Sequence, residues 1–107
     1  MTYAVHLMAS AEEDLYHLQN YIAEAESRET AEAVAAQLEI LSQSLAEFPE
    51  RGHITAELKA MDIIDYREVH YHSYRVIYRV DGQDVFIYAI LDGRRDLKTI
   101  LYERLVR

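Results

Sequence analysis

The chain has 107 residues, of which 50% are hydrophobic, and carries a formal net charge of −8 at pH 7. This length predicts one domain spanning residues 1–107, and the absence of cysteine excludes both a disulfide framework and a thiolate metal site. The N-terminus has no basic leader and no window approaches a membrane span, so we expect a cytoplasmic protein without membrane contact.

The charge is distributed unevenly between the two halves of the chain. Residues 1–62 hold 12 acidic and 3 basic side chains (net −9), whereas residues 63–107 hold 7 acidic and 8 basic ones (net +1). Because Lys and Arg contacts to phosphate dominate nucleic-acid binding, the chain as a whole is poorly suited to bind RNA or DNA by itself. A local cationic patch in the arginine-rich second half remains possible.

The first 25 residues predict a strand followed by a helix. Residues 2–8 are fairly apolar on both alternating faces, as in an interior or covered strand. Ser10 and Glu13 have the spacing of a capping box, which predicts that Ser10 starts the helix. Apolar residues then follow at helical spacing up to the break at residues 25–28.

A second helix is expected from about residue 29 to residue 47. Its apolar positions recur at steps of three and four, and Pro49 and Gly52 end it. Because the link between the two helices is short, we expect them to form an antiparallel hairpin. The apolar stripe lasts for less than three heptads, so core packing against a sheet is favoured over a coiled coil.

The second half predicts three strands after a connection at residues 54–62. The strands span residues 63–72, 74–80 and 85–91, with a hairpin loop at residues 81–84 between the last two and a tighter turn between the first two. On the middle strand, Arg75, Ile77 and Arg79 share one face, and the apolar and tyrosine side chains share the other.

The chain ends with a short predicted helix over residues 96–107, for which Asp96 is the N-cap. The resulting order of elements is strand, helix, helix, three strands and helix. This order predicts an α+β fold in which the N-terminal helical hairpin packs on an antiparallel sheet of about four strands.

Arginines recur inside the predicted strands and at the Gly-Arg-Arg-Asp corner of residues 93–96. They are Arg67, Arg75, Arg79, Arg94 and Arg95. One interpretation is a single exposed patch that holds an anionic partner, since guanidinium groups make bidentate contacts with carboxylates and phosphates. The alternative is a surface network of ion pairs with acidic neighbours, namely Asp65, Glu68, Asp92 and Asp96.

Two histidines, His70 and His72, stand two residues apart on a predicted strand and therefore on one face. This is the geometry of a pair of metal-binding imidazoles, but no third ligand stands at useful spacing, although His6 or Glu68 could reach. We therefore expect simple polar exposure, with no metal and no cofactor.

Several segments in a fixed order are similar to those of a known group of proteins. They are Ala11-x-x-Asp14-Leu15, Tyr21-Ile22, Phe48-Pro49-x-x-Gly52, residues 74–80 and Gly93-Arg94-Arg95-Asp96-Leu97. Over nearly its whole length the chain resembles the RelE/ParE superfamily, the toxins of bacterial type II toxin–antitoxin pairs. The resemblance implies a βααβββ arrangement and a cognate antitoxin that wraps the toxin, with DNA contacted only indirectly through that antitoxin.

The superfamily divides by target, and the resemblance favours its ParE-like branch. RelE-like members cleave mRNA on the ribosome without a metal, whereas ParE-like members inhibit DNA gyrase. Arg75 and Arg95 occupy arginine positions of the RelE-like site, but Tyr66 and Glu68 stand where it carries lysines. We therefore expect a gyrase-binding toxin that acts without catalysis.

Two alternatives remain. One is a ribosome-dependent mRNA endonuclease, for which the catalytic candidates are Arg75, Arg95 and Tyr102, the last one residue out of register. The other is a non-toxic protein that still binds the antitoxin. For the favoured reading, the residues expected to contact antitoxin or target are the five arginines named above together with Tyr16 and Tyr21, which lie near the edge of the first helix's apolar stripe.

Overall fold

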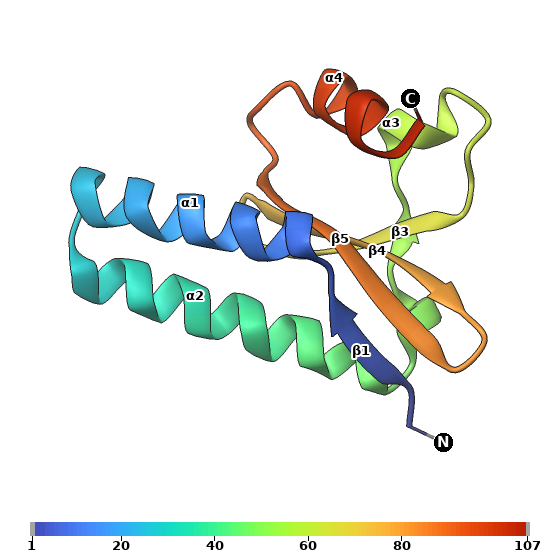
Figure 1. Ribbon diagram of the computed structural model, residues 1–107, viewed down its shortest axis with the longest axis horizontal. Helices are drawn as coiled ribbons and strands as arrows, with labels where there is room; N and C mark the ends of the chain where they lie inside the picture. The colour runs from blue at the N-terminus through green and yellow to red at the C-terminus, as the bar shows by residue number, and fades with distance from the viewer. Residues whose placement is uncertain (1, 107) are drawn as a thin grey trace.

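The computed structural model describes residues 2–106 (Figure 1). The first half comprises strand β1 (Ala4–Leu7), helices α1 (Ala9–Ala25) and α2 (Arg28–Gln43), and the short 3-10 helices η1 (Ser44–Ala46) and η2 (Pro49–Arg51). The second half comprises β2 (His53–Ile54), α3 (Ala56–Lys59), β3 (Tyr66–Tyr71), β4 (Tyr74–Asp81), β5 (Asp84–Asp92), α4 (Leu97–Leu101) and the π-helical turn η3 (Tyr102–Val106). None of these helices has the length and hydropathy needed to cross a bilayer.

The strands form one five-stranded sheet in the order β1-β5-β4-β3-β2. β2, β3, β4 and β5 pair antiparallel, but β1 lies parallel to β5, with Val5 opposite Val85. The α+β class is confirmed, whereas the expected antiparallel sheet of about four strands is corrected to a mixed sheet of five. The additional strand, β2, has two residues, which is too few to show a period of two in the sequence.

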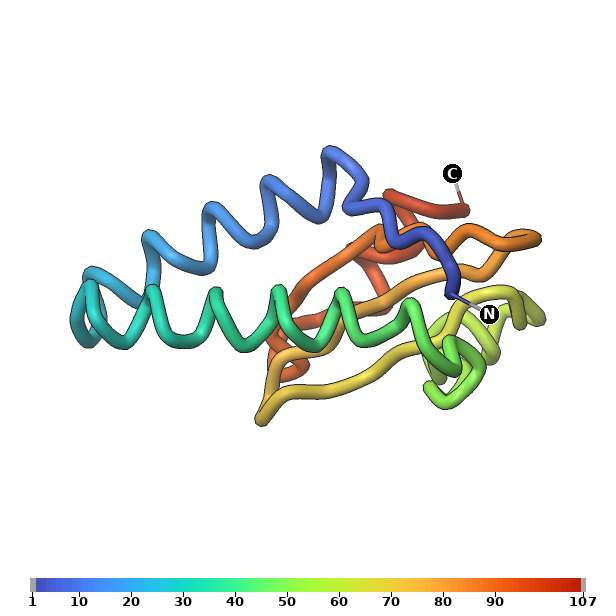
Figure 2. Tube along the Cα trace, turned by 90° about the horizontal axis from the view of Figure 1, so that it is seen from below, coloured from blue at the N-terminus to red at the C-terminus, as the bar shows by residue number. Residues whose placement is uncertain are grey.

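The α1–α2 hairpin covers one face of the sheet, and its loop end projects beyond the strands (Figures 1 and 2). The buried side chains between hairpin and sheet are Ala11, Leu15, Ala35, Leu38, Leu45, Val76, Tyr78, Val85, Ile87 and Ile90. The predicted hairpin is therefore confirmed. Its second helix ends at Gln43, four residues earlier than expected, and the chain continues as the 3-10 turn η1.

The start of α1 differs from the prediction. The helix begins at Ala9 with Met8 as its N-cap, and no side chain caps it. The Ser10 hydroxyl donates instead to the carbonyl oxygen of Tyr88 at 2.8 Å, so it ties the helix to β5. The capping-box prediction was wrong because Ser10 lies inside the helix rather than at its N-cap, and its hydroxyl bonds to a strand carbonyl. The other predicted cap, Asp96, is confirmed by its bond from the Thr99 amide at 3.4 Å.

The opposite face of the sheet is covered by α3, α4 and the turn that follows α4 (Figure 1). The buried side chains of this second core are Leu58, Tyr66, Ile77, Ala89, Leu91, Leu97 and Leu101. A register shift between β4 and β5 pairs Ile77 with Ala89 and Tyr78 with Ile87, so Tyr88 is an extra residue on β5. The C-terminal helix was expected to reach residue 107, a position that lies outside the described residues.

Gly52 lies at the end of the segment that links the helical hairpin to the sheet. Its neighbours are packed so closely that they leave no room for a side chain at this position. The Tyr78 hydroxyl donates to the carbonyl of Pro49 and accepts from the Gly52 amide at 3.1 Å. A Cβ atom on Gly52 would meet that hydroxyl and would lie 2.6 Å from the Glu68 carbonyl oxygen. The Phe48-Pro49-x-x-Gly52 segment is thus anchored on the buried side chain of Tyr78.

Gly52→Ala is expected to destabilise the domain by about 1–3 kcal/mol, because the new methyl group forces backbone and side chain apart. Urea unfolding of the variant and the wild type measures the difference. Gly82→Ala is the comparison, since its Cβ meets nothing within 4 Å and only the strain of its positive φ (62°) remains. A Gly52→Ala protein as stable as the wild type would contradict this packing.

Candidate functional site

Arg75 of β4 is held by two carboxylates on the sheet face that α3 and α4 cover. Its Nε and Nη2 donate to the two oxygens of Glu68 at 2.8 and 2.6 Å, and its Nη1 and Nη2 donate to those of Glu57 at 2.8 and 2.6 Å. Only 13% of the Arg75 side chain and 2% of the Glu68 side chain are exposed. Both contacts are bidentate, so the guanidinium is almost fully engaged inside the protein.

The proximity of these groups determines their ionisation. Burial acts to raise the pKa of the Glu68 carboxyl, but the hydrogen bonds from Arg75 and His70 outweigh it and hold that pKa below its ordinary value. The hydrogen bond from Arg75 lowers the pKa of Glu57 against a smaller desolvation effect, and the hydrogen bond from Glu57 raises the pKa of Arg75. Arg75, Glu57 and Glu68 are all charged near neutral pH, so the net charge of the three side chains is −1.

Stability is expected to fall in acid because of these lowered carboxyl pKa values. A group whose pKa is lower in the folded state stabilises the fold above its unfolded pKa, and this contribution disappears as the pH drops through the folded value. For Glu57 and Glu68 the loss therefore begins below the ordinary pKa of 4.5. Urea midpoints measured from neutral pH to about pH 3 should fall, and they should fall less steeply in Glu57→Gln. Equal slopes in the two proteins would contradict the assignment to this network.

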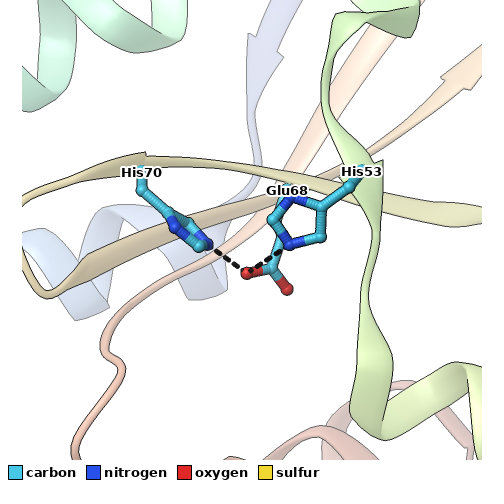
Figure 3. A group of neighbouring side chains, drawn as sticks. All are labelled: His53, Glu68 and His70. Atoms are coloured by element: carbon cyan, nitrogen blue, oxygen red, sulfur yellow. Dashed lines mark hydrogen bonds and ion pairs between the residues drawn. The ribbon is translucent and has the colours of Figure 1, made fainter.

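Two histidines flank the Glu68 carboxylate (Figure 3). His70 of β3 donates through Nε2 to Glu68 Oε2, and His53 of β2 places its Nε2 3.4 Å from the same oxygen. Of the predicted ligand candidates, Glu68 lies beside His70, but His6 pairs with Asp84 at 2.8 Å instead. His72 does not lie on β3 as predicted. It lies in the β3–β4 turn with a φ of 53°, and its ring packs on Tyr71.

Of the other candidate arginines, Arg67 and Arg79 line one depression, which Arg75, Arg94 and Arg95 do not line. Arg67 donates to the Gly52 carbonyl at 2.7 Å, and Arg79 lies over the rings of Tyr66 and Tyr88. Arg94 is 74% exposed and pairs with Asp92 at 2.6 Å. The prediction of a single exposed arginine patch was wrong, because strand alternation and the covering helices bury Arg75. Two ion pairs of the kind expected from the alternative network are present, Arg75–Glu68, which is buried, and Arg94–Asp92.

A cavity of about 490 Å³ lies between α1, the end of β5 and the C-terminal segment. Tyr21 and Arg95 both line it. Its remaining lining residues are Asp14, His17, Leu18, Ile90, Leu91, Asp92 and Arg104. The structure thus brings together one tyrosine and one arginine of the predicted binding set. Tyr16 is exposed on the same helix but does not line the cavity.

An ion pair forms part of the wall of this cavity. Arg104 donates to both carboxylate oxygens of Asp14, at 2.6 and 3.0 Å, and Asp14 also accepts from the Ile90 amide at 3.0 Å. Asp14 therefore joins α1, β5 and the C-terminal turn around the cavity. The resemblance had included Asp14 in its first segment, but no pattern in the sequence indicated Arg104, 90 residues away, as its partner.

The three residues of the nuclease alternative are not brought together. Arg75 lies in its carboxylate pairs and Arg95 lines the cavity beside α1. Tyr102 is exposed on the C-terminal turn, where it lines a separate shallow depression with Met61 and Lys98. The cavity that Arg95 lines includes neither Arg75 nor Tyr102, and the depression that Tyr102 lines includes neither arginine.

Comparison with solved structures places the fold among toxin–antitoxin proteins. One similar structure is a chain of the chromosomal ParDE toxin–antitoxin system from P. aeruginosa, with a TM-score of 0.69 and 14% identity, covering 83% of this chain and 94% of that chain. Another belongs to the toxin–antitoxin complex RelBE2 from Mycobacterium tuberculosis, with a TM-score of 0.62 and 19% identity, covering 84% of this chain and 96% of that chain. The domain shares its fold with these two chains.

The family is identified by sequence. Residues 5–97 match the family model described as the ParE toxin of the type II toxin–antitoxin system parDE. The chain therefore belongs to the ParE toxin family. No curated protein matches the chain at a significant level.

Proposed function

We propose that this chain is the toxin of a type II pair, that it inhibits growth by binding DNA gyrase, and that a cognate antitoxin neutralises it. Membership of the ParE toxin family supports the toxin assignment. One observation favours a toxin that acts by binding over one that cleaves RNA: Arg75 is already paired with Glu57 and Glu68. A guanidinium that already holds two carboxylates is not free to stabilise a phosphate in a transition state.

The buried Glu68 adds to this argument. RNA cleavage needs cationic or proton-donating groups around the reacting phosphate, and an ionised carboxylate there repels it. In this chain Glu68 remains ionised at neutral pH because its pKa is lowered, and Arg95 and Tyr102 lie elsewhere. The mRNA endonuclease is therefore the less favoured alternative.

The surface proposed for the antitoxin is the cavity between α1 and the end of β5. Tyr21 is 66% exposed at its rim, and Arg95 is exposed and supplies a positive charge. Exposed tyrosine and arginine side chains around a concavity are typical of residues that dominate the energy of protein interfaces. An antitoxin segment with an apolar anchor for the cavity and a carboxylate for Arg95 fits this chemistry.

Expression of the chain in a bacterial host tests the proposal. Growth arrest is expected, and co-expression of a short open reading frame adjacent to the gene should restore growth and yield a stable complex. Purified protein added to translating ribosomes should leave mRNA intact. Cleavage of mRNA would establish the endonuclease alternative, and a complex without any growth arrest would establish the non-toxic one.

A further inference from the structure

Three side chains on one edge of the sheet direct metal-binding atoms toward one point. His53 comes from β2, and Glu68 and His70 come from β3 (Figure 3). One ligand atom from each lies within 4.8 Å of the others. Within residues 2–106 this is the one group of three or more histidine and carboxylate side chains that meets this criterion.

The backbone fixes this arrangement. In the antiparallel β2–β3 pair His53 stands directly opposite Glu68, and His70 follows Glu68 by two residues on the same face. The short strand β2 is held at both ends, because the Gly52 amide donates to Tyr78 and the Thr55 amide donates to the Tyr66 carbonyl at 3.0 Å. Ligands on paired strands are held more precisely than ligands on loops.

The separation between His53 and Glu68 suits a tetrahedral ion, whereas His70 lies in direct hydrogen-bond contact with Glu68. Zinc bonded to nitrogen or oxygen at about 2.0–2.1 Å holds its ligand atoms about 3.3 Å apart. His53 Nε2 and Glu68 Oε2 are 3.4 Å apart, and the two imidazole rings are perpendicular with centroids 5.1 Å apart. His70 Nε2 donates to the same oxygen in a short hydrogen bond. An ion would replace that proton, and the exposed His70 ring would move back from Glu68 to admit it. The groove beside the three residues has a volume of about 380 Å³, which leaves room for a water as fourth ligand.

The surroundings supply the matching charge and orientation. Glu68 is almost fully buried, and together with Glu57 and Arg75 it gives a local charge of −1. Arg75 donates to both oxygens of this carboxylate, including the Oε2 that the histidines contact, and so fixes its orientation, while Glu57 offsets the charge of Arg75. A divalent cation would therefore meet an oriented, ionised carboxylate between two imidazoles.

We propose that His53, Glu68 and His70 bind a divalent transition-metal ion, with Zn²⁺ the best match to two imidazoles and one carboxylate. The ion would join β2 to β3 and so fasten the segment that connects the helical hairpin to the sheet. This site is independent of the proposed toxin function, since none of its residues lines the cavity that Tyr21 and Arg95 line.

Titration calorimetry with ZnCl₂ on the chelator-treated full-length protein at neutral pH tests the proposal. One site per chain is expected, and His53→Ala and His70→Ala should each weaken binding by about tenfold or more. His53 is 63% exposed, so its replacement leaves the core intact, which circular dichroism verifies. His6→Ala and His72→Ala are the matched controls and should bind Zn²⁺ like the wild type.

Cobalt provides a second readout. Co²⁺ in a tetrahedral site gives intense visible absorption, which is expected for the wild type and His72→Ala and should be lost in His53→Ala. The proposal is overturned if the wild type binds no Zn²⁺, if His53→Ala binds it as tightly as the wild type, or if His6→Ala and His72→Ala lose as much affinity as His53→Ala.

Discussion

Replacement of Arg75 by alanine is expected to destabilise the domain by about 3–5 kcal/mol. The substitution leaves the buried carboxylate of Glu68 without its guanidinium and removes the bidentate contact to Glu57. Urea unfolding followed by circular dichroism measures the loss. Arg94→Ala is the matched control, because Arg94 is exposed on the surface and its removal should leave the midpoint nearly unchanged.

A double substitution separates the cost of the orphaned carboxylate from that of lost packing. Arg75→Met with Glu68→Leu removes both charges and should recover much of the stability that Arg75→Ala loses. An Arg75→Ala protein within about 1 kcal/mol of the wild type would contradict the description of this ion pair as buried. The result also decides how toxicity data are read, because an inactive Arg75 variant would report unfolding rather than a missing contact.

Tyr21→Ala and Arg95→Ala are each expected to weaken binding of the cognate antitoxin by about 2 kcal/mol, or about 30-fold. This expectation rests on the proposed function and on the cavity that the two side chains line. Tyr21 supplies apolar area at the rim and Arg95 supplies charge. Titration calorimetry with purified antitoxin gives the two dissociation constants.

The chain offers a matched control for each substitution. Tyr102→Ala removes an exposed tyrosine from the C-terminal turn, and Arg94→Ala removes the arginine next to Arg95, yet neither residue lines the cavity. Both controls should bind the antitoxin with wild-type affinity. If Tyr102→Ala weakens the complex as much as Tyr21→Ala does, the antitoxin docks on a different face.

The parts of the fold that could be predicted are those with long periodic patterns. The helical hairpin and β3, β4 and β5 each carry enough residues for their periods to show. The parallel pairing of β1 with β5 and the presence of β2 could not be predicted, because both depend on contacts between distant segments. Ser10 shows the same dependence on a distant segment. Its spacing to Glu13 fits a helix cap, but its hydroxyl donates a hydrogen bond to the carbonyl of Tyr88, which is far away in the sequence.

The candidate site was predicted in part for similar reasons. The Arg75–Glu68 pair could be expected because both residues stand on adjoining predicted strands. The Arg75–Glu57 pair could not be expected, because Glu57 lies in the connection between β2 and β3, where no sequence pattern indicates the direction of a side chain. His53 lies on a strand of two residues, so its position beside His70 follows only from the β2–β3 register. The expectation of no metal site rested on the lack of a third ligand for His70 and His72. The proposed site contains Glu68, which the sequence analysis named, and His53 in place of His72.

The central claim is that this toxin fold acts on gyrase by binding. The most direct measurement is inhibition of DNA supercoiling by purified gyrase in the presence of the purified chain. We predict inhibition that increases with the concentration of the chain and disappears when one equivalent of antitoxin is added. Full supercoiling activity in the presence of excess folded chain, together with cleavage of mRNA on ribosomes by the same preparation, would contradict the account.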